Sequence, residues 1–148
     1  MLSARLIRLI ETHQEEISAR ALHDIRLHPD LSQIRNLQDL ELRERARRIL
    51  GQLGKWLAED EELAREYEHL GDTRFEESIP LHESVRALFI IKDKMIDFVK
   101  EQGVKRDSVE LYAEEELERR VDRFFDELVI HLVRGYEGAW RRAAHAAA

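Results

Sequence analysis

The sequence contains no cysteine, and this absence excludes disulfide bonds, zinc sites built from thiolates and thiol-based catalysis. A chain without cysteine is typical of a reducing compartment, so we expect a cytoplasmic protein. Only 2 prolines and 6 glycines occur in 148 residues. All-β folds need many tight turns, and this scarcity argues against them. Residues 1–27 hold no uninterrupted apolar run, so we expect neither a signal peptide nor a contact with the membrane.

The sequence is instead rich in both apolar and charged residues. It is 43% hydrophobic and 37% charged, a composition typical of amphipathic helices with solvated outer faces. The length fits a single domain over residues 1–148 that can bury a core of its own. The net charge is −7, and basic residues are interleaved with acidic ones. Binding to nucleic acid needs a clustered basic surface, so we expect no nucleic-acid partner.

Apolar residues recur at three- and four-residue spacing along most of the chain, which predicts amphipathic helices. Pro29 is expected to end the first helix, and Asp39 is expected to cap the second. Pro80 is expected to open the fourth helix, which Gly103 then ends. The predicted helices cover residues 1–28, 39–59, 60–77, 81–102 and 109–143. The predicted fold is therefore all-α, an antiparallel bundle of four to five long helices.

Two of the predicted helices stand out. The helix over residues 81–102 carries the run Leu88-Phe89-Ile90-Ile91, which is apolar on all sides and predicts the most deeply buried helix. The helix over residues 109–143 has one continuous apolar face and would be roughly 50 Å long at 1.5 Å per residue. We expect its ends to extend past the bundle.

Residues that bind metals or catalyse reactions are present, but not at the spacing that such sites need. Glu66-x-x-His69 is the single match to a motif that a two-metal bundle site uses twice, together with two further glutamates. The sequence has no Ser-His-Asp set, phosphate-binding glycine loop or His-Glu-x-x-His motif. We therefore expect no catalytic residue, no metal and no cofactor, and the chain is predicted not to be an enzyme.

Histidines on apolar helix faces leave a haem site as an open alternative. His131 lies on the core-facing side of the last predicted helix, and His13 and His82 are further candidates for a haem ligand. Gly135 and Gly138 follow His131 on the same side, where they would either open a pocket or let another helix come close. The other interpretation is a core histidine that hydrogen-bonds to a neighbour or to a backbone carbonyl group.

A more specific pattern begins at residue 67. It reads Tyr67-x-x-Leu70-Gly71-x-x-Arg74, then Ile79-Pro80-Leu81-x-Glu83-x-Val85-x-Ala87-Leu88, then Lys92. It continues in Ile49-Leu50-x-x-Leu53-Gly54-x-Trp56-Leu57, Glu110-Leu111-Tyr112, Phe124-Phe125-Asp126 and Arg134-Gly135-Tyr136. Over residues 3–142 the chain resembles the RsbRD-type N-terminal domain, the amino-terminal module of RsbT co-antagonist proteins and related bacterial regulators.

The resemblance implies a non-catalytic sensor or input domain in bacterial signal transduction, connected with the stress response. It also implies a globin-like helical fold without haem, because related stress-sensor input domains adopt that fold. The family supplies no catalytic residue to carry over to this chain.

The first functional hypothesis is a regulatory interaction domain that acts through helix repacking. A small apolar ligand or a partner helix would bind between the helices over residues 81–102 and 109–143. The expected ligand-contacting residues are Phe89, His131, Gly135 and Gly138.

Two alternatives remain open. One is a structural bundle that forms a homodimer through an exposed patch of Tyr136 and Trp140 on the last helix. The other is a haem-binding globin-like sensor that uses His131, His82 or His13.

Overall fold

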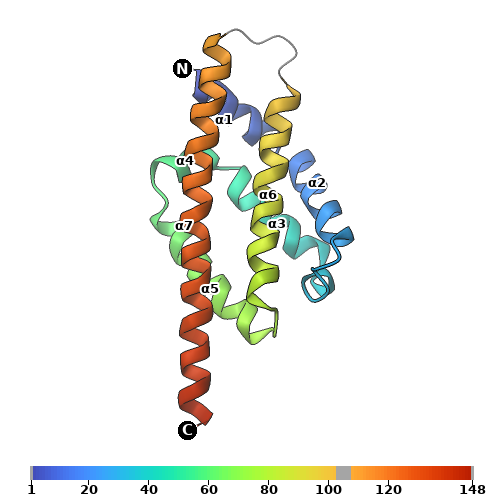
Figure 1. Cartoon of the computed structure of the whole chain (residues 1–148), viewed down its shortest axis with the longest axis vertical. Coiled ribbons are helices and arrows are strands. Elements are labelled where there is room, and N and C mark those ends of the chain that lie inside the picture. The colour runs from blue at the N-terminus through green and yellow to red at the C-terminus, as the bar shows by residue number, and fades with distance from the viewer. Residues whose placement is uncertain (1, 103–107, 148) are drawn as a thin grey trace.

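The computed structural model describes residues 2–102 and 108–147 of the chain (Figure 1). Within these residues it contains seven α-helices, one short 3-10 helix and no β-strand. They are α1 (Leu2–Thr12), α2 (Gln14–Leu27), η1 (Ile34–Asn36), α3 (Asp39–Leu50), α4 (Leu53–Ala58), α5 (Glu61–Glu76), α6 (Leu81–Glu101) and α7 (Ser108–Ala147). The prediction of an all-α helical bundle is confirmed. Gly103, the expected end of the fourth predicted helix, lies outside the described residues.

The longest helices, α6 and α7, lie side by side and run antiparallel (Figure 1). α7 has 40 residues, which corresponds to a length of about 60 Å. Its final turns project beyond the rest of the bundle (Figure 1). α5 packs along α7 in the most extensive helix–helix contact of the described residues, and α2 contacts both α3 and α6.

Two helices that the sequence predicts as continuous are broken. The predicted helix over residues 1–28 is α1 and α2, which meet at His13 with φ −103° and ψ 23°. The predicted helix over residues 39–59 is α3 and α4, and its break includes Gly51. Ile10 and Ile17 are both fully buried although they lie on opposite sides of the first break. The bend therefore lets both halves follow the curved surface of the core, a tertiary effect that periodicity does not reveal.

The predicted helix ends are also corrected in two places. Asp39 is the first residue of α3 rather than its N-cap, and the N-cap residue Gln38 makes no side-chain capping bond. The Asp39 carboxylate instead forms an ion pair with Arg26 of α2. At the other end of the chain, α7 continues to Ala147 instead of stopping at residue 143. Alanine has the highest helix propensity, so the alanine-rich end extends the helix.

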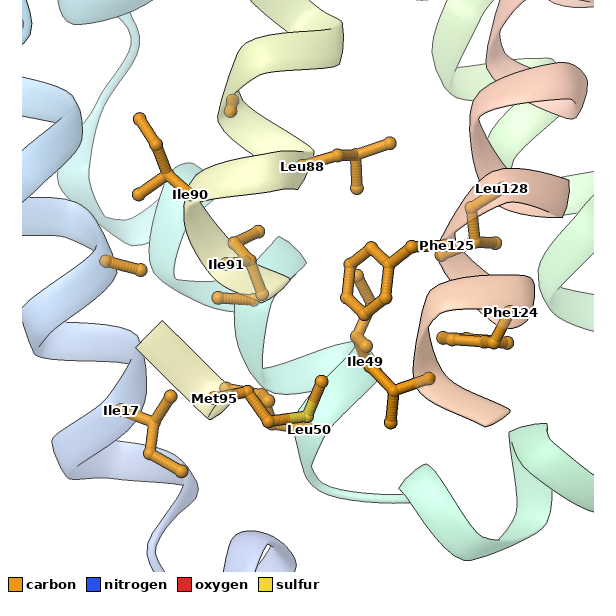
Figure 2. Close-up of a cluster of buried hydrophobic side chains, with 14 of the residues drawn as sticks. Ile17, Ile49, Leu50, Leu88, Ile90, Ile91, Met95, Phe124, Phe125 and Leu128 are labelled. Carbon is orange, nitrogen blue, oxygen red and sulfur yellow. The ribbon is translucent and has the colours of Figure 1, made fainter. Parts of the chain in front are cut away.

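The core is one apolar cluster to which all seven α-helices contribute. Figure 2 shows its middle, where Ile17 of α2, Ile49 of α3, Met95 of α6 and Phe125 of α7 come together. All four side chains are completely buried. Burial of each such side chain contributes about 1.5–3 kcal/mol, and the core thus joins parts of the chain that are far apart in sequence.

The run of apolar residues in α6 is not buried on all sides. Leu88, Ile90 and Ile91 are buried, but Phe89 is 37% exposed. Neighbouring helices cover the other sides of α6, and Phe89 lies on the side that they leave open. The Nζ of Lys92 lies 5.1 Å from the centre of the Phe89 ring.

Candidate functional site

α5 and α7 cross at a pair of glycines. A Cβ atom on Gly71 would overlap with the carbonyl oxygen of Leu132 and lie 3.0 Å from the Cα of Gly135. A Cβ atom on Gly135 would overlap with the carbonyl oxygen of Glu68 and lie 2.9 Å from the amide nitrogen of Asp72. The backbones of the two helices are therefore in contact, and only glycine allows them to come this close.

Next to this crossing, Tyr136 ties α7 to the start of α6. Its hydroxyl group donates a hydrogen bond to the backbone carbonyl oxygen of Ile79 at 2.9 Å. It shares a second hydrogen bond, of 2.7 Å, with the Ser84 hydroxyl group. Burial raises the pKa of Tyr136, while the bond from Ser84 acts in the opposite direction. Tyr136 is only 6% exposed, so it does not form the predicted exposed patch with Trp140, which is 63% exposed.

A buried arginine fixes the far end of α5. Arg74 is 3% exposed, and its Nη1 donates to a carboxylate oxygen of Glu41 at 2.6 Å and of Glu77 at 2.8 Å. A buried charge without partners would be strongly destabilising. Glu41 on α3 therefore holds the end of α5 in place, and Glu77 at that same end is the second partner of Arg74. The chain then turns at Ser78, whose φ of 61° is left-handed. α6 begins at Leu81 as predicted, but Pro80 is its N-cap residue rather than its first residue.

A second buried charge holds the 3-10 helix. Glu83 at the start of α6 is 1% exposed. Its carboxylate accepts hydrogen bonds from the backbone amides of Gln33 at 2.9 Å and of Ile34 at 3.1 Å. These amides lie at the beginning of η1, where no backbone acceptor is available to them within the helix. Glu83 therefore attaches η1 to α6.

The predicted ligand residues do not converge on one cavity between α6 and α7. Gly135 is covered by the backbone of α5. Together with Gly138 it lines a surface groove of about 330 Å³ between α5 and α7, whose other lining residues are charged or histidine. Neither Phe89 nor His131 lines this groove. Phe89 is exposed on α6, and His131 is half-buried on α7.

A small cavity does lie between α6, α7 and the helices behind them. It has a volume of about 40 Å³, and its lining includes Leu88 and Ile91 of α6, Leu132 of α7 and Tyr67 of α5. Space of this size holds about one water molecule. It is too small for the apolar ligand that the first hypothesis placed between these helices.

The histidines proposed as haem ligands differ in their surroundings. The Nδ1 of His13 is 2.9 Å from the carbonyl oxygen of Leu9, and its ring packs against Phe98 at a centroid distance of 5.0 Å. His13 is thus a histidine that hydrogen-bonds to a backbone carbonyl group, which is the alternative to a haem ligand that the sequence left open. His82 is exposed. Across the residues that the structure describes, no group of three or more histidine or acidic side chains could hold a metal ion.

A pocket of about 440 Å³, which sequence reasoning missed, lies at the end of the bundle where α1 packs. It is formed by α1, the last turns of α6 and the first turns of α7. Its lining residues are Arg5, Leu6, Arg8, Leu9, Thr12, His13, Val99, Gln102, Glu110, Ala113 and Glu114. The spacing of Arg5, Arg8 and Thr12 places them on one side of α1, which is a signal that sequence reasoning could have used.

The protein is therefore a helical bundle whose longest helix, α7, extends beyond the core at its C-terminal end. The chain matches the family described as the RsbT co-antagonist protein rsbRD N-terminal domain over residues 15–148. It belongs to this family, as the resemblance in its sequence predicted. No curated protein and no solved structure matches the chain.

Membership assigns the chain to the input modules of stress-response signalling regulators, a regulatory family rather than a known catalytic one. The match begins at residue 15, so α1 lies outside the matched residues. In the described part of the chain, no helix is long and apolar enough to cross a membrane.

Proposed function

We propose that this chain is an input domain in which binding changes the packing of α7, and that α7 carries the change to an output partner. The observation that carries the proposal is the attachment of α7. α7 contacts the backbone of α5 at Gly71 and Gly135, and Tyr136 hydrogen-bonds to Ser84 of α6 and to Ile79 just before it. Residues 140–147 of the same helix are all exposed. A shift at the crossing would therefore move a surface that the bundle does not cover.

The partner in this proposal is a protein. The family description names proteins that act as co-antagonists of RsbT, and we extend that role to this chain. Control of RsbT by a cytoplasmic regulator is thus the pathway that we propose. A small apolar ligand near Gly135 has less support, because the backbone of α5 fills that position and the neighbouring cavity holds only about one water.

The test is a series of alanine insertions in the exposed part of α7, between Arg142 and Ala143. The chain would replace the N-terminal domain of a co-antagonist that has its own output domain, and RsbT-dependent transcription would be followed with a reporter. One inserted helical residue rotates the output domain relative to the bundle by about 100°, so two insertions rotate it by about 200° and seven restore the phase to within about 20°.

We expect two inserted alanines to abolish regulation and seven to restore it. Equal regulation by all the insertion variants would show that the orientation of α7 carries no signal. Loss of regulation in all of them, the seven-residue variant included, would contradict the proposal as well.

A homodimer is the second candidate, and one observation favours it. Trp140 is 63% exposed, and residues 141–147, which follow it on α7, are exposed as well. Large exposed aromatic side chains of this kind are frequent at protein interfaces. In this version, the second copy is the partner of α7, and the same helix both dimerises and signals.

A further inference from the structure

The pocket beside α1 has a firmly held wall. Ile7 and Ile10 of α1 are buried in the core. The carboxylate of Glu11 accepts a hydrogen bond of 3.1 Å from the backbone amide of Gly54 in α4. Gly54 also leaves room for α1, since a Cβ there would lie 3.3 Å from the side chain of Ile7. These contacts fix the position of α1 on the bundle, and with it the positions from which its side chains enter the pocket.

The floor of the pocket is apolar. Leu6 and Leu9 of α1 are half-buried, whereas Val99 of α6 and Ala113 of α7 are buried. The volume of about 440 Å³ falls in the range of roughly 300–1,000 Å³ that is typical of small-molecule sites. A ligand with an apolar body would cover this floor and remove it from water.

The charged groups around the floor differ between the two walls. Arg5 and Arg8 of α1 are exposed, and among the described residues no ion pair or hydrogen bond joins either of them to another side chain. Glu110 and Glu114 line the pocket from α7 and have other interactions as well. A carboxylate has about four acceptor positions, so such interactions leave capacity for a further donor. The pocket thus presents guanidinium groups on the α1 side and carboxylate groups on the α7 side.

We propose that this pocket binds a small zwitterion with an apolar body, such as an apolar amino acid or a short apolar peptide. The ligand's carboxylate lies against Arg5 and Arg8, and its ammonium group lies against Glu110 and Glu114. Its apolar part covers the leucines of α1. Guanidinium groups suit a carboxylate because they present several donors in one plane. A molecule with a single charge could engage the charged groups of only one wall.

This ligand is the input that the proposed function requires, and in that respect the inference rests on it. The pocket lies at the first turns of α7, while the glycine crossing lies further along the same helix. Binding is measured directly on the purified chain, without any output partner. Failure to bind would remove this inference alone, whereas the insertion series in α7 tests the proposed function alone.

The experiment is isothermal titration calorimetry of the full chain with matched probes. L-Leucine and the dipeptide leucyl-leucine supply both charges at two spacings. 4-Methylpentanoate has the leucine skeleton without the ammonium group, and 3-methylbutylamine has it without the carboxylate. We expect at least one zwitterion to bind at least fivefold more tightly than both single-charge probes.

Substitutions on each wall test which residues bind the carboxylate and which bind the ammonium group of the ligand. The double variant Arg5→Gln/Arg8→Gln should weaken binding of the zwitterion at least fivefold, and Glu110→Gln/Glu114→Gln should remove its advantage over 4-methylpentanoate. Arg43→Gln, at an exposed arginine on α3, is the matched control and should bind as the wild type does. Circular dichroism checks that every variant is folded.

Three outcomes would overturn the inference. No binding of any probe at millimolar concentration would remove the site. Equal binding of the zwitterions and 4-methylpentanoate would make it a site for simple anions. Unchanged binding in both double variants would place the ligand elsewhere on the molecule.

Discussion

At the scale of single residues, the contrast between two glycines of α7 tests the helix crossing. Gly135→Ala puts a methyl group into the backbone of α5, whereas at Gly138 the nearest atom to a new Cβ is Nη1 of Arg142 at 3.6 Å. We expect Gly135→Ala to destabilise the chain by about 1–3 kcal/mol, the usual cost of overpacking. Gly138→Ala should stabilise it by up to about 1 kcal/mol through higher helix propensity. Urea denaturation measures both, and equal effects would contradict the close crossing.

Because of a buried tyrosine, the stability of the chain should depend on pH in the alkaline range. Tyr67 is 2% exposed, and burial raises the pKa of its hydroxyl group. Unfolded tyrosine loses its proton near pH 10, whereas the folded chain keeps this proton to higher pH. The folded state then binds more protons than the unfolded state, so stability is fully present below about pH 10 and falls as the pH rises above it.

Above about pH 10, each such tyrosine lowers the free energy of unfolding by about 1.4 kcal/mol per pH unit. We expect Tyr67→Phe to remove the contribution of one tyrosine to the pH dependence of the unfolding free energy. Urea denaturation curves measured between neutral and strongly alkaline pH give this free energy at each pH. Burial also raises the pKa of Tyr136, so part of the dependence should remain. Tyr112→Phe, at a 62% exposed position, is the control. A Tyr67→Phe variant with the wild-type slope would contradict this account.

At the scale of secondary-structure elements, Glu83 is expected to hold η1 in place. Glu83→Ala leaves the amides of Gln33 and Ile34 without the carboxylate that now accepts from them. A buried donor without an acceptor costs about 1–3 kcal/mol, so η1 should open more often. Hydrogen exchange of these two amides should become faster by at least tenfold relative to the amides of α6.

The control for this prediction is Glu76→Ala, an exposed glutamate at the end of α5. It should leave the exchange rates in η1 unchanged. Unaltered protection of Gln33 and Ile34 in Glu83→Ala would show that apolar packing alone, for example by the buried Ile34, holds the segment.

The sequence predicted most elements well because their signals are local. Pro80 and the acidic residues from Asp60 onward mark helix starts, and α5 and α6 begin within a residue of the predicted positions. The break at His13 has no such signal, because it contains neither proline nor glycine. It depends on how α1 and α2 fit the same core, which only long-range packing decides.

The candidate site shows the same limit. Gly135 was predicted either to open a pocket or to admit another helix, and the second alternative is correct. Which helix approaches could not be read from the sequence, because Gly71 lies far from Gly135 along the chain. Tyr136 likewise has an aromatic ring that suits either a surface patch or the core. Its placement in the core depends on partners from other parts of the chain, the Ser84 hydroxyl group of α6 and the carbonyl group of Ile79.

At the scale of the whole molecule, the exposed end of α7 is the part through which a second copy could bind. In the homodimer version of the proposed function, Trp140 lies in the contact between the two copies. Trp140→Ser should then lower the apparent mass toward that of one chain, because buried aromatic residues often dominate interface energies. Light scattering coupled to size-exclusion chromatography, over about a hundredfold range of concentration, gives the mass directly.

Leu40→Ser is the matched control for this variant. Leu40 lies on α3 and is 67% exposed, close to the 63% of Trp140, so both substitutions remove a large exposed apolar side chain. If both variants associate as the wild type does, α7 does not form the interface. If the wild type has the mass of a single chain at every concentration, no homodimer forms, and the exposed turns of α7 remain available to a different protein. That result would leave an output protein, rather than a second copy, as the partner of α7 in the proposed function.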